Sequence, residues 1–180
     1  MNRLGLSAGD LAQEETLTRV AHAAILRDVL EGNLPELPPP QQPWPFNLQR
    51  SEKLVWVFPH VSYYTEHSSR AYVGGSHGVS LRVMKGVYYR VGAFKANPVV
   101  TTETRLTDSG PLGVTTKHLY FHGSSKIFRV PYAKVVSFTP YSDGIGVVRD
   151  AQSAKPQTFE TGDGWFAYNL VVNLAKLAQP

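Results

Sequence analysis

From Arg50 onward the hydrophobic pattern has a period of two residues and keeps it for most of the chain. Strand-like segments occupy residues 53–58, 80–91, 99–106, 112–121, 126–130, 134–141, 144–150 and 157–161. They are short, rich in β-branched and aromatic residues, and separated by the turn-forming sequences SGP, HGSS, SDG and SAKP. Seven or eight strands in series, without helices between them, predict a mainly β fold, an antiparallel barrel or sandwich. Pro131 and Pro140 indicate strand ends or edge strands, because proline cannot donate a ladder hydrogen bond.

Helices are predicted only near the two ends of the chain. Residues 13–32 are rich in Ala, Leu, Glu and Arg, and Gly32-Asn33 supplies a stop signal. Their apolar stripe is broad, which favours contact with more than one surface. Residues 165–178 form a second helical segment, with Asp163 as its expected N-cap.

The C-terminal helix is predicted to be apolar on two sides. One line, expected to face the barrel, consists of Phe166, Leu170, Leu174 and Leu177. The other line needs a second partner, either the N-terminal helix of the same chain or a neighbouring subunit. The candidate interaction surface is therefore formed by Trp165, Tyr168 and Val172 together with Ile25 and Val29 of the N-terminal helix.

Between the N-terminal helix and the first strand lies a proline-rich segment, with prolines at 35, 38, 39, 40, 43 and 45. Proline at this density excludes a helix or a central strand and favours an extended strap. Trp44 and Phe46 are expected to pin the strap onto the domain. The resulting division is an N-terminal helical extension (1–33), a proline-rich strap (34–49) and a barrel domain (50–180). Residues 40–43 also fit the PxxP pattern of SH3 and WW ligands, a less favoured interpretation.

Composition excludes several classes of protein. The 180 residues contain no cysteine, which excludes disulfide scaffolds, thiolate metal sites and a cysteine nucleophile. No apolar run approaches the roughly 20 residues that span a bilayer. The first residues turn acidic before any apolar region develops, so no signal peptide is expected. These features predict a cytoplasmic protein, either free or peripheral to a membrane surface.

The net charge of +4 is unevenly distributed. Residues 1–49 carry −3 and residues 50–180 carry +7. The sharpest excess, 67–102, has five bases and no acid: Arg70, Arg82, Lys85, Arg90 and Lys95. Such a surface attracts phosphates of lipid headgroups or nucleic acid, although scattered bases also serve solubility. The backbone amides of the loop containing Gly74, Gly75 and Ser76 could cradle an anion beside these bases.

Three other chemical patterns are weaker. Residues 74–78 read G-x-S-x-G, but the segment after Ser76 is β-patterned, whereas a nucleophile elbow needs a following helix. His118 and His122, four apart on a strand, would lie about 13 Å apart, too far to share a metal ion. His60 and His67 could meet His77 across a hairpin, yet nothing requires it, and no metal is predicted. We retain a serine hydrolase only as a less favoured alternative.

Aromatic residues near the bases could stack on single-stranded nucleic acid. The candidates are Tyr63, Tyr64, Tyr88, Tyr89 and Tyr141. At strand spacing such residues are more typical of a core or of cross-strand pairs. Nucleic acid is therefore an unfavoured partner.

The segments 110–123, 126–132 and 134–137 carry a resemblance to a known family. They follow the order G-x-L-x-V-T, a tight turn, H-L-x-F-x-G, a strand ending in V-P-Y, and a strand opening K-V-V-S. This pattern resembles the GRAM and prokaryotic branches of the pleckstrin-homology-like superfamily. The resemblance implies a seven-stranded antiparallel barrel capped by a C-terminal helix, without cofactor or catalysis. It also implies binding of anionic lipids or proteins, in some members with oligomerisation.

Lys53, Arg82, Lys85 and Arg90 do not reproduce the spacing of the superfamily's phosphoinositide motif. A general anionic surface is therefore expected. The sequence predicts a non-catalytic binding module that engages an anionic lipid headgroup or a protein partner. The alternative is an interaction or oligomerisation module without lipid binding.

Overall fold

The computed structural model describes residues 8–35, 37, 42–72, 82–84, 87–88, 98–152 and 154–178. The chain divides into two compact units. We call residues 1–65 together with 106–180 the core unit, and residues 66–105 the inserted unit.

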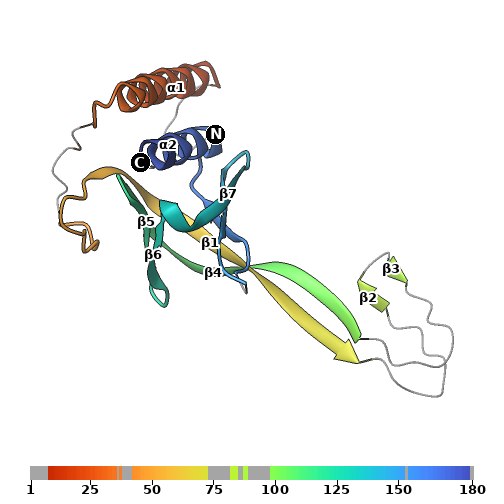
Figure 1. Cartoon of the computed structure of the whole chain (residues 1–180). Coiled ribbons are helices and arrows are strands. Elements are labelled where there is room, and N and C mark those ends of the chain that lie inside the picture. The colour runs from red at the N-terminus through yellow and green to blue at the C-terminus, as the bar shows by residue number, and fades with distance from the viewer. Residues whose placement is uncertain are drawn as a thin grey trace. The chain divides into compact units, whose positions relative to one another are not determined.

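Seven strands form one antiparallel, curled half-barrel sheet, as the sequence predicted (Figure 1). They are β1 (Leu54–Tyr72), β4 (Pro98–Thr115), β5 (His118–His122), β6 (Ile127–Pro131), β7 (Val135–Pro140), β8 (Gly144–Arg149) and β9 (Gln157–Glu160). Their order is β6-β5-β4-β1-β9-β8-β7. A short 3-10 helix, η1 (Tyr132–Lys134), joins β6 to β7. In the inserted unit, β2 (Arg82–Met84) and β3 (Val87–Tyr88) pair as a separate two-stranded sheet.

Local sequence sets this topology. Within the β4–β5 hairpin, Leu112 pairs with Phe121 and Val114 with Leu119, and all four side chains are buried, as the alternation predicted. The predicted edge positions are also confirmed. Pro131 and Pro140 end β6 and β7, the two outermost strands of the sheet.

One predicted turn is wrong. The sequence Ser109-Gly110-Pro111 does not turn but lies inside the continuous strand β4. Gly110 is needed for close packing instead, because a Cβ there would lie 2.2 Å from the carbonyl oxygen of His122. The glycine lets two backbones approach closely within the sheet.

The C-terminal helix α2 (Gly164–Leu177) packs on the sheet (Figure 1). Its N-cap is Asp163, as predicted, whose Oδ1 accepts the Phe166 N–H at 2.9 Å. Leu177, expected to face the barrel, is instead 54 % exposed. The reason is that the buried side of α2 passes through Ala175 in the last turn, so Leu177 lies outside it. The buried residues are Gly164, Phe166, Ala167, Leu170, Val171, Leu174 and Ala175.

The N-terminal helix α1 (Ala8–Leu30) ends at the predicted stop. Gly32 has a φ of 83°, and the N–H of Asn33 donates to the Asp28 carbonyl at 2.8 Å. The N–H of Gly32 donates to the Val29 carbonyl at 3.0 Å, which completes a Schellman cap. Glycine is favoured here because L side chains rarely adopt a positive φ.

Helix α1 lies beside α2 (Figure 1). Its contact face uses the helical spacing of His22, Ile25, Leu26 and Val29, of which Leu26 and Val29 are buried in the core. On another side, Leu17 and Val20 are exposed. The apolar pattern of α1 is thus only partly covered by its own chain.

Aromatic rings fill the core inside the curl of the sheet. Tyr63 lies against Phe121, Phe128 and Phe159, with ring centroids 5.1 to 5.2 Å apart. The predicted contact of the strap with the domain is confirmed for Phe46, whose ring centroid lies 6.1 Å from that of Tyr120 and whose ring packs on Gly113. Trp44 stacks on Phe46, with ring centroids 6.5 Å apart. None of the helices in the described ranges is long and apolar enough to cross a membrane.

Candidate functional site

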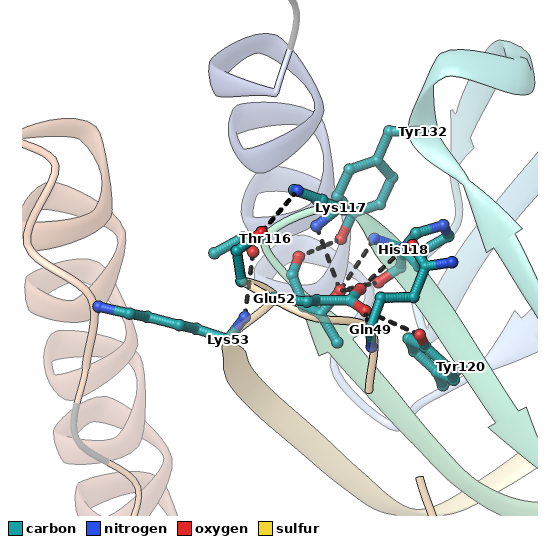
Figure 2. Close-up of polar contacts among 10 residues, drawn as sticks. Gln49, Glu52, Lys53, Thr116, Lys117, His118, Tyr120 and Tyr132 are labelled. Atoms are coloured by element: carbon teal, nitrogen blue, oxygen red, sulfur yellow. Dashed lines mark hydrogen bonds and ion pairs between the residues drawn. The ribbon is translucent and has the colours of Figure 1, made fainter. Parts of the chain in front are cut away.

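A buried carboxylate occupies the corner where the strap enters β1 (Figure 2). The side chain of Glu52 has no solvent exposure. Its Oε2 accepts the Gln49 N–H at 2.9 Å and the Tyr120 hydroxyl at 2.8 Å. Its Oε1 lies 2.7 Å from His118 Nδ1 and accepts the Thr115 hydroxyl. Glu52 thereby joins the strap to β4 and β5.

The electrostatics of this cluster follow from burial and hydrogen bonding. Burial would raise the pKa of Glu52, but donors led by Thr115 and Gln49 outweigh it and hold the pKa below its ordinary value. The pKa of Tyr120 is raised by burial and by its bond to the carboxylate. Burial also raises the pKa of Tyr132, whose hydroxyl donates to the Thr115 carbonyl at 2.8 Å.

The Glu52 cluster is a structural joint. Both carboxylate oxygens already hold two partners each, so no acceptor position points at a ligand. Two hydrogen bonds between Lys53 and Thr116 extend the joint. Thr116 N–H donates to the Lys53 carbonyl at 3.0 Å, and Lys53 N–H donates to the Thr116 hydroxyl at 3.2 Å. Sequence reasoning missed Glu52 because its partners lie 63 or more residues away, apart from Gln49.

A second carboxylate, Asp108 on β4, organises the β5–β6 turn. It accepts the N–H groups of Ser125 at 2.8 Å and Lys126 at 2.7 Å, and the Ser124 hydroxyl at 2.8 Å. Chiefly because of the backbone bond from Ser125, its pKa lies far below the ordinary range, although desolvation opposes this. Gly123 allows the approach, since a Cβ there would lie 2.2 Å from Asp108 Oδ2.

A polar latch joins α1 to α2. His22 Nδ1 lies 2.9 Å from Asp163 Oδ2, while the other oxygen of Asp163 caps α2. The imidazole stacks on Phe166, with centroids 3.8 Å apart and planes at 14°, and meets Trp56 edge-on at 5.8 Å. The sequence did not predict the contact between His22 and Asp163, because 141 residues separate them.

Beside the latch is an open cleft of about 520 Å³. Its charged lining consists of Glu14, Glu15, Arg19, His22 and Asp163. Trp165, 40 % exposed, lies in the same lining, and the Arg19 guanidinium is 5.8 Å from its ring centroid. The cleft's cation is thus already stacked on the indole.

The predicted interaction surface is largely covered by its own chain. Val29 is fully buried, so its side chain does not contribute to a free surface. Ile25 and Tyr168 are half-buried against the core, and Val172 is also half-buried. Helix α1 of the same chain contacts α2, whereas Trp165 of the predicted surface is 40 % exposed. A neighbouring subunit as a further partner stays a prediction.

Most predicted anion-binding residues lie outside what the structure describes. Gly74, Gly75, Ser76, Lys85, Arg90 and Lys95 fall outside the described residues, as does His77. For Arg70 and Arg82 only the backbone is described: Arg70 belongs to β1, and Arg82 pairs across the hairpin with Tyr88. The prediction that these bases converge remains a prediction.

Several of the tyrosines and histidines considered as ligand-binding residues have other roles in the structure. Tyr63 is not available for stacking, because it is buried and its hydroxyl accepts from Gln157 Nε2 at 2.6 Å. Tyr64 instead donates to Glu160 at 2.8 Å, a cross-strand bond. His118 is engaged by Glu52, whereas His60 and His67 are exposed. Within the described ranges no three acidic or imidazole groups gather as metal ligands would.

These features define a mainly β protein, a curled sheet with one helix against it and a second helix latched on. Comparison with protein-family models, curated proteins and solved structures found no match to the chain.

Proposed function

We propose that the protein is a non-catalytic binding module whose inserted unit engages anionic lipid headgroups. The observation that supports this is the division of charge between the two units. Residues 66–105 hold six bases and two acids, a net +4, which leaves 12 bases and 12 acids in the core unit. The whole net charge of the protein therefore belongs to the inserted unit.

The acids of the inserted unit neutralise little of this charge. One of the two, Glu103, is already held by Arg105, whose guanidinium approaches it at 2.7 Å. The remaining bases are the five of the sequence prediction: Arg70, Arg82, Lys85, Arg90 and Lys95. The β2–β3 pairing sets Arg82 opposite Tyr88, a basic and aromatic combination suited to the headgroup region.

The expected affinity is electrostatic and additive. Each base near an anionic membrane surface contributes about 1 kcal/mol, so five contribute about 5 kcal/mol. The attraction must weaken with salt, because the Debye length falls from about 10 Å at 0.1 M to about 3 Å at 1 M.

The test is co-sedimentation of the full chain with vesicles of phosphatidylcholine containing phosphatidylserine, at low and high salt. One variant changes the five inserted-unit bases to Gln. A matched control changes five exposed core-unit bases to Gln: Arg27, Arg50, Lys134, Lys155 and Lys176. Both variants lose the same net charge, so only the position of the charge differs.

We expect the wild type and the control to sediment with anionic vesicles at low salt, the control somewhat more weakly. The inserted-unit variant should bind at least a hundredfold more weakly. Equal losses in both variants, or no vesicle binding at low salt, would overturn the proposal. Binding to a single-stranded oligonucleotide without binding to vesicles would replace it with the nucleic-acid alternative.

A further inference from the structure

The β5–β6 hairpin carries an apolar groove that the lipid proposal does not use. The groove holds about 300 Å³ and lies between this hairpin and residues 45–47 of the strap. Its principal lining side chains are Phe46, Tyr120, His122, Ile127, Phe128 and Arg129. Ile127 is 68 % exposed, the largest exposure among the large hydrophobic residues that the structure describes.

The wall of the groove is held in place before any ligand arrives. The Phe46 ring packs so closely on Gly113 that a Cβ there would lie 2.7 Å from it. The opposite wall is part of a hairpin whose turn is fixed by Asp108. A preformed groove lowers the ordering cost of binding.

The groove is small and open. Ligand pockets usually enclose about 300–1,000 Å³ and bury most of the ligand. This groove is at the lower end of that range and opens to solvent, so it fits one large apolar side chain of a longer ligand.

The backbone beside the groove suggests what that longer ligand is. Strand β6 is outermost in the sheet. Gly123 N–H donates to the Lys126 carbonyl at 2.8 Å, so with the observed register Phe128 and Val130 continue the hydrogen-bonded pairs with β5. The N–H and C=O groups of Ile127 and Arg129 therefore face the open edge, where an extended peptide could pair with them.

Charge selects the kind of peptide. The sequence between Asp108 and Asp143 contains four bases and no acid: Lys117, Lys126, Arg129 and Lys134. All four are exposed, whereas the two nearby carboxylates, Glu52 and Asp108, are buried in their own hydrogen bonds. Of the four, Arg129 lines the groove itself, and no acidic side chain among the described residues is in that lining. The groove therefore presents a positive charge beside apolar side chains, which complements an acidic and apolar segment.

We propose that the free edge of β6 binds an extended peptide with a large apolar residue and an acidic residue two positions away. In a strand, residues two apart point to the same side and lie about 6.6 Å apart. Ile127 and Arg129 have that same spacing, so the apolar side chain enters the groove beside Ile127 while the carboxylate meets Arg129. This inference is independent of the lipid proposal.

The experiment begins with a phage-displayed library of short random peptides, selected on the immobilised full chain. We expect enrichment of the apolar–x–acidic pattern. A fluorescent peptide from the selection is then titrated against Ile127→Asp, Arg129→Gln and the control Val136→Asp. Val136 is the matched position because it is exposed, at 66 %, on the opposite edge strand β7.

Binding should weaken at least tenfold in Ile127→Asp and about tenfold in Arg129→Gln, while Val136→Asp should bind as wild type does. N-methylation of alternate peptide nitrogens tests strand pairing: methylating those that face β6 should abolish binding, and methylating the others should not. This arm needs no change in the protein, so it remains decisive if Ile127→Asp fails to fold.

Three results would overturn the inference. The first is failure to enrich any peptide above a bare-surface control. The second is a selected peptide that binds wild type, Ile127→Asp and Val136→Asp equally. The third is a peptide whose binding is indifferent to the position of N-methylation.

Discussion

The core unit and the inserted unit use their charges in opposite ways. In the core unit bases and acids balance, and its buried carboxylates Glu52 and Asp108 are saturated by donors from the same chain. In the inserted unit bases outnumber acids six to two. In the core unit, buried carboxylates therefore connect segments of the same chain through hydrogen bonds. In the inserted unit, the excess positive charge is suited to an external anion.

This contrast makes stability and binding separable. Substitutions of buried residues in the core unit should alter the free energy of unfolding and leave vesicle binding intact in the protein that remains folded. Changes in the inserted unit should do the reverse.

The largest effect is expected for Phe159→Ala. Phe159 is fully buried on β9 and contacts the rings of Tyr63, Phe121 and Phe128. Truncation removes its apolar contacts and leaves a cavity, so the free energy of unfolding should fall by about 3–5 kcal/mol. Urea denaturation measures this loss. A loss below about 1 kcal/mol would show that this ring is not central to the core.

Glu52→Gln should come next, with a loss of about 2–3 kcal/mol at neutral pH. The amide keeps the shape of the side chain but loses the charge. Its NH₂ group cannot accept the hydrogen bonds of the oxygen it replaces, which come from Gln49 and Tyr120 at Oε2 or from Thr115 at Oε1. Urea denaturation at neutral pH measures the effect, with Glu160→Gln as a less buried carboxylate control on β9.

The loss of stability in Glu52→Gln should depend on pH. Because folding lowers the pKa of Glu52, its stabilisation is fully present above the ordinary value of 4.5 and is lost as the pH falls toward the lower pKa of the folded state. The stability difference between wild type and Glu52→Gln should therefore shrink below about pH 4.5. A difference that stays constant into acid would contradict the role of the charged carboxylate.

The local hydrophobic pattern predicted much of the fold of the core unit. It did not predict the hydrogen bonds that connect segments far apart in the sequence. The alternation in residues 112–121 placed Leu112, Val114, Leu119 and Phe121 correctly, because strand periodicity is a property of neighbouring residues. The joints at Glu52 and His22 depend on partners 63 to 141 residues away, apart from Gln49. No local signal distinguishes such a residue from an ordinary surface residue.

The SGP segment shows a second limit of local pattern. Glycine and proline at 110–111 are typical of a turn, yet here they lie inside β4, where Gly110 contacts the backbone of β5. A glycine required for close packing has the same one-letter code as a glycine required for a turn. Only the neighbouring strand decides between them.

His22→Ala should have a smaller, local effect. It removes the bond to Asp163 and the stacking on Phe166, but it leaves the N-cap of α2 in place. We expect a loss of about 1–2 kcal/mol, mostly as weaker docking of α1. Hydrogen exchange should accelerate in residues 8–30 and stay unchanged in β5 and β8. Uniform acceleration across the sheet would mean that α1 and the sheet unfold together.

The smallest change in stability is expected for the double variant Arg82→Gln and Lys85→Gln, which sharpens the comparison most. Neither base belongs to the core unit, so the free energy of unfolding should change by less than about 0.5 kcal/mol. Vesicle binding should nevertheless weaken about thirtyfold, because two bases contribute about 2 kcal/mol at an anionic surface. The paired control, Lys134→Gln and Lys155→Gln, removes the same charge from the core unit and should weaken binding only slightly. If both double variants bind equally, the attraction depends on net charge alone and the inserted unit has no special part in it.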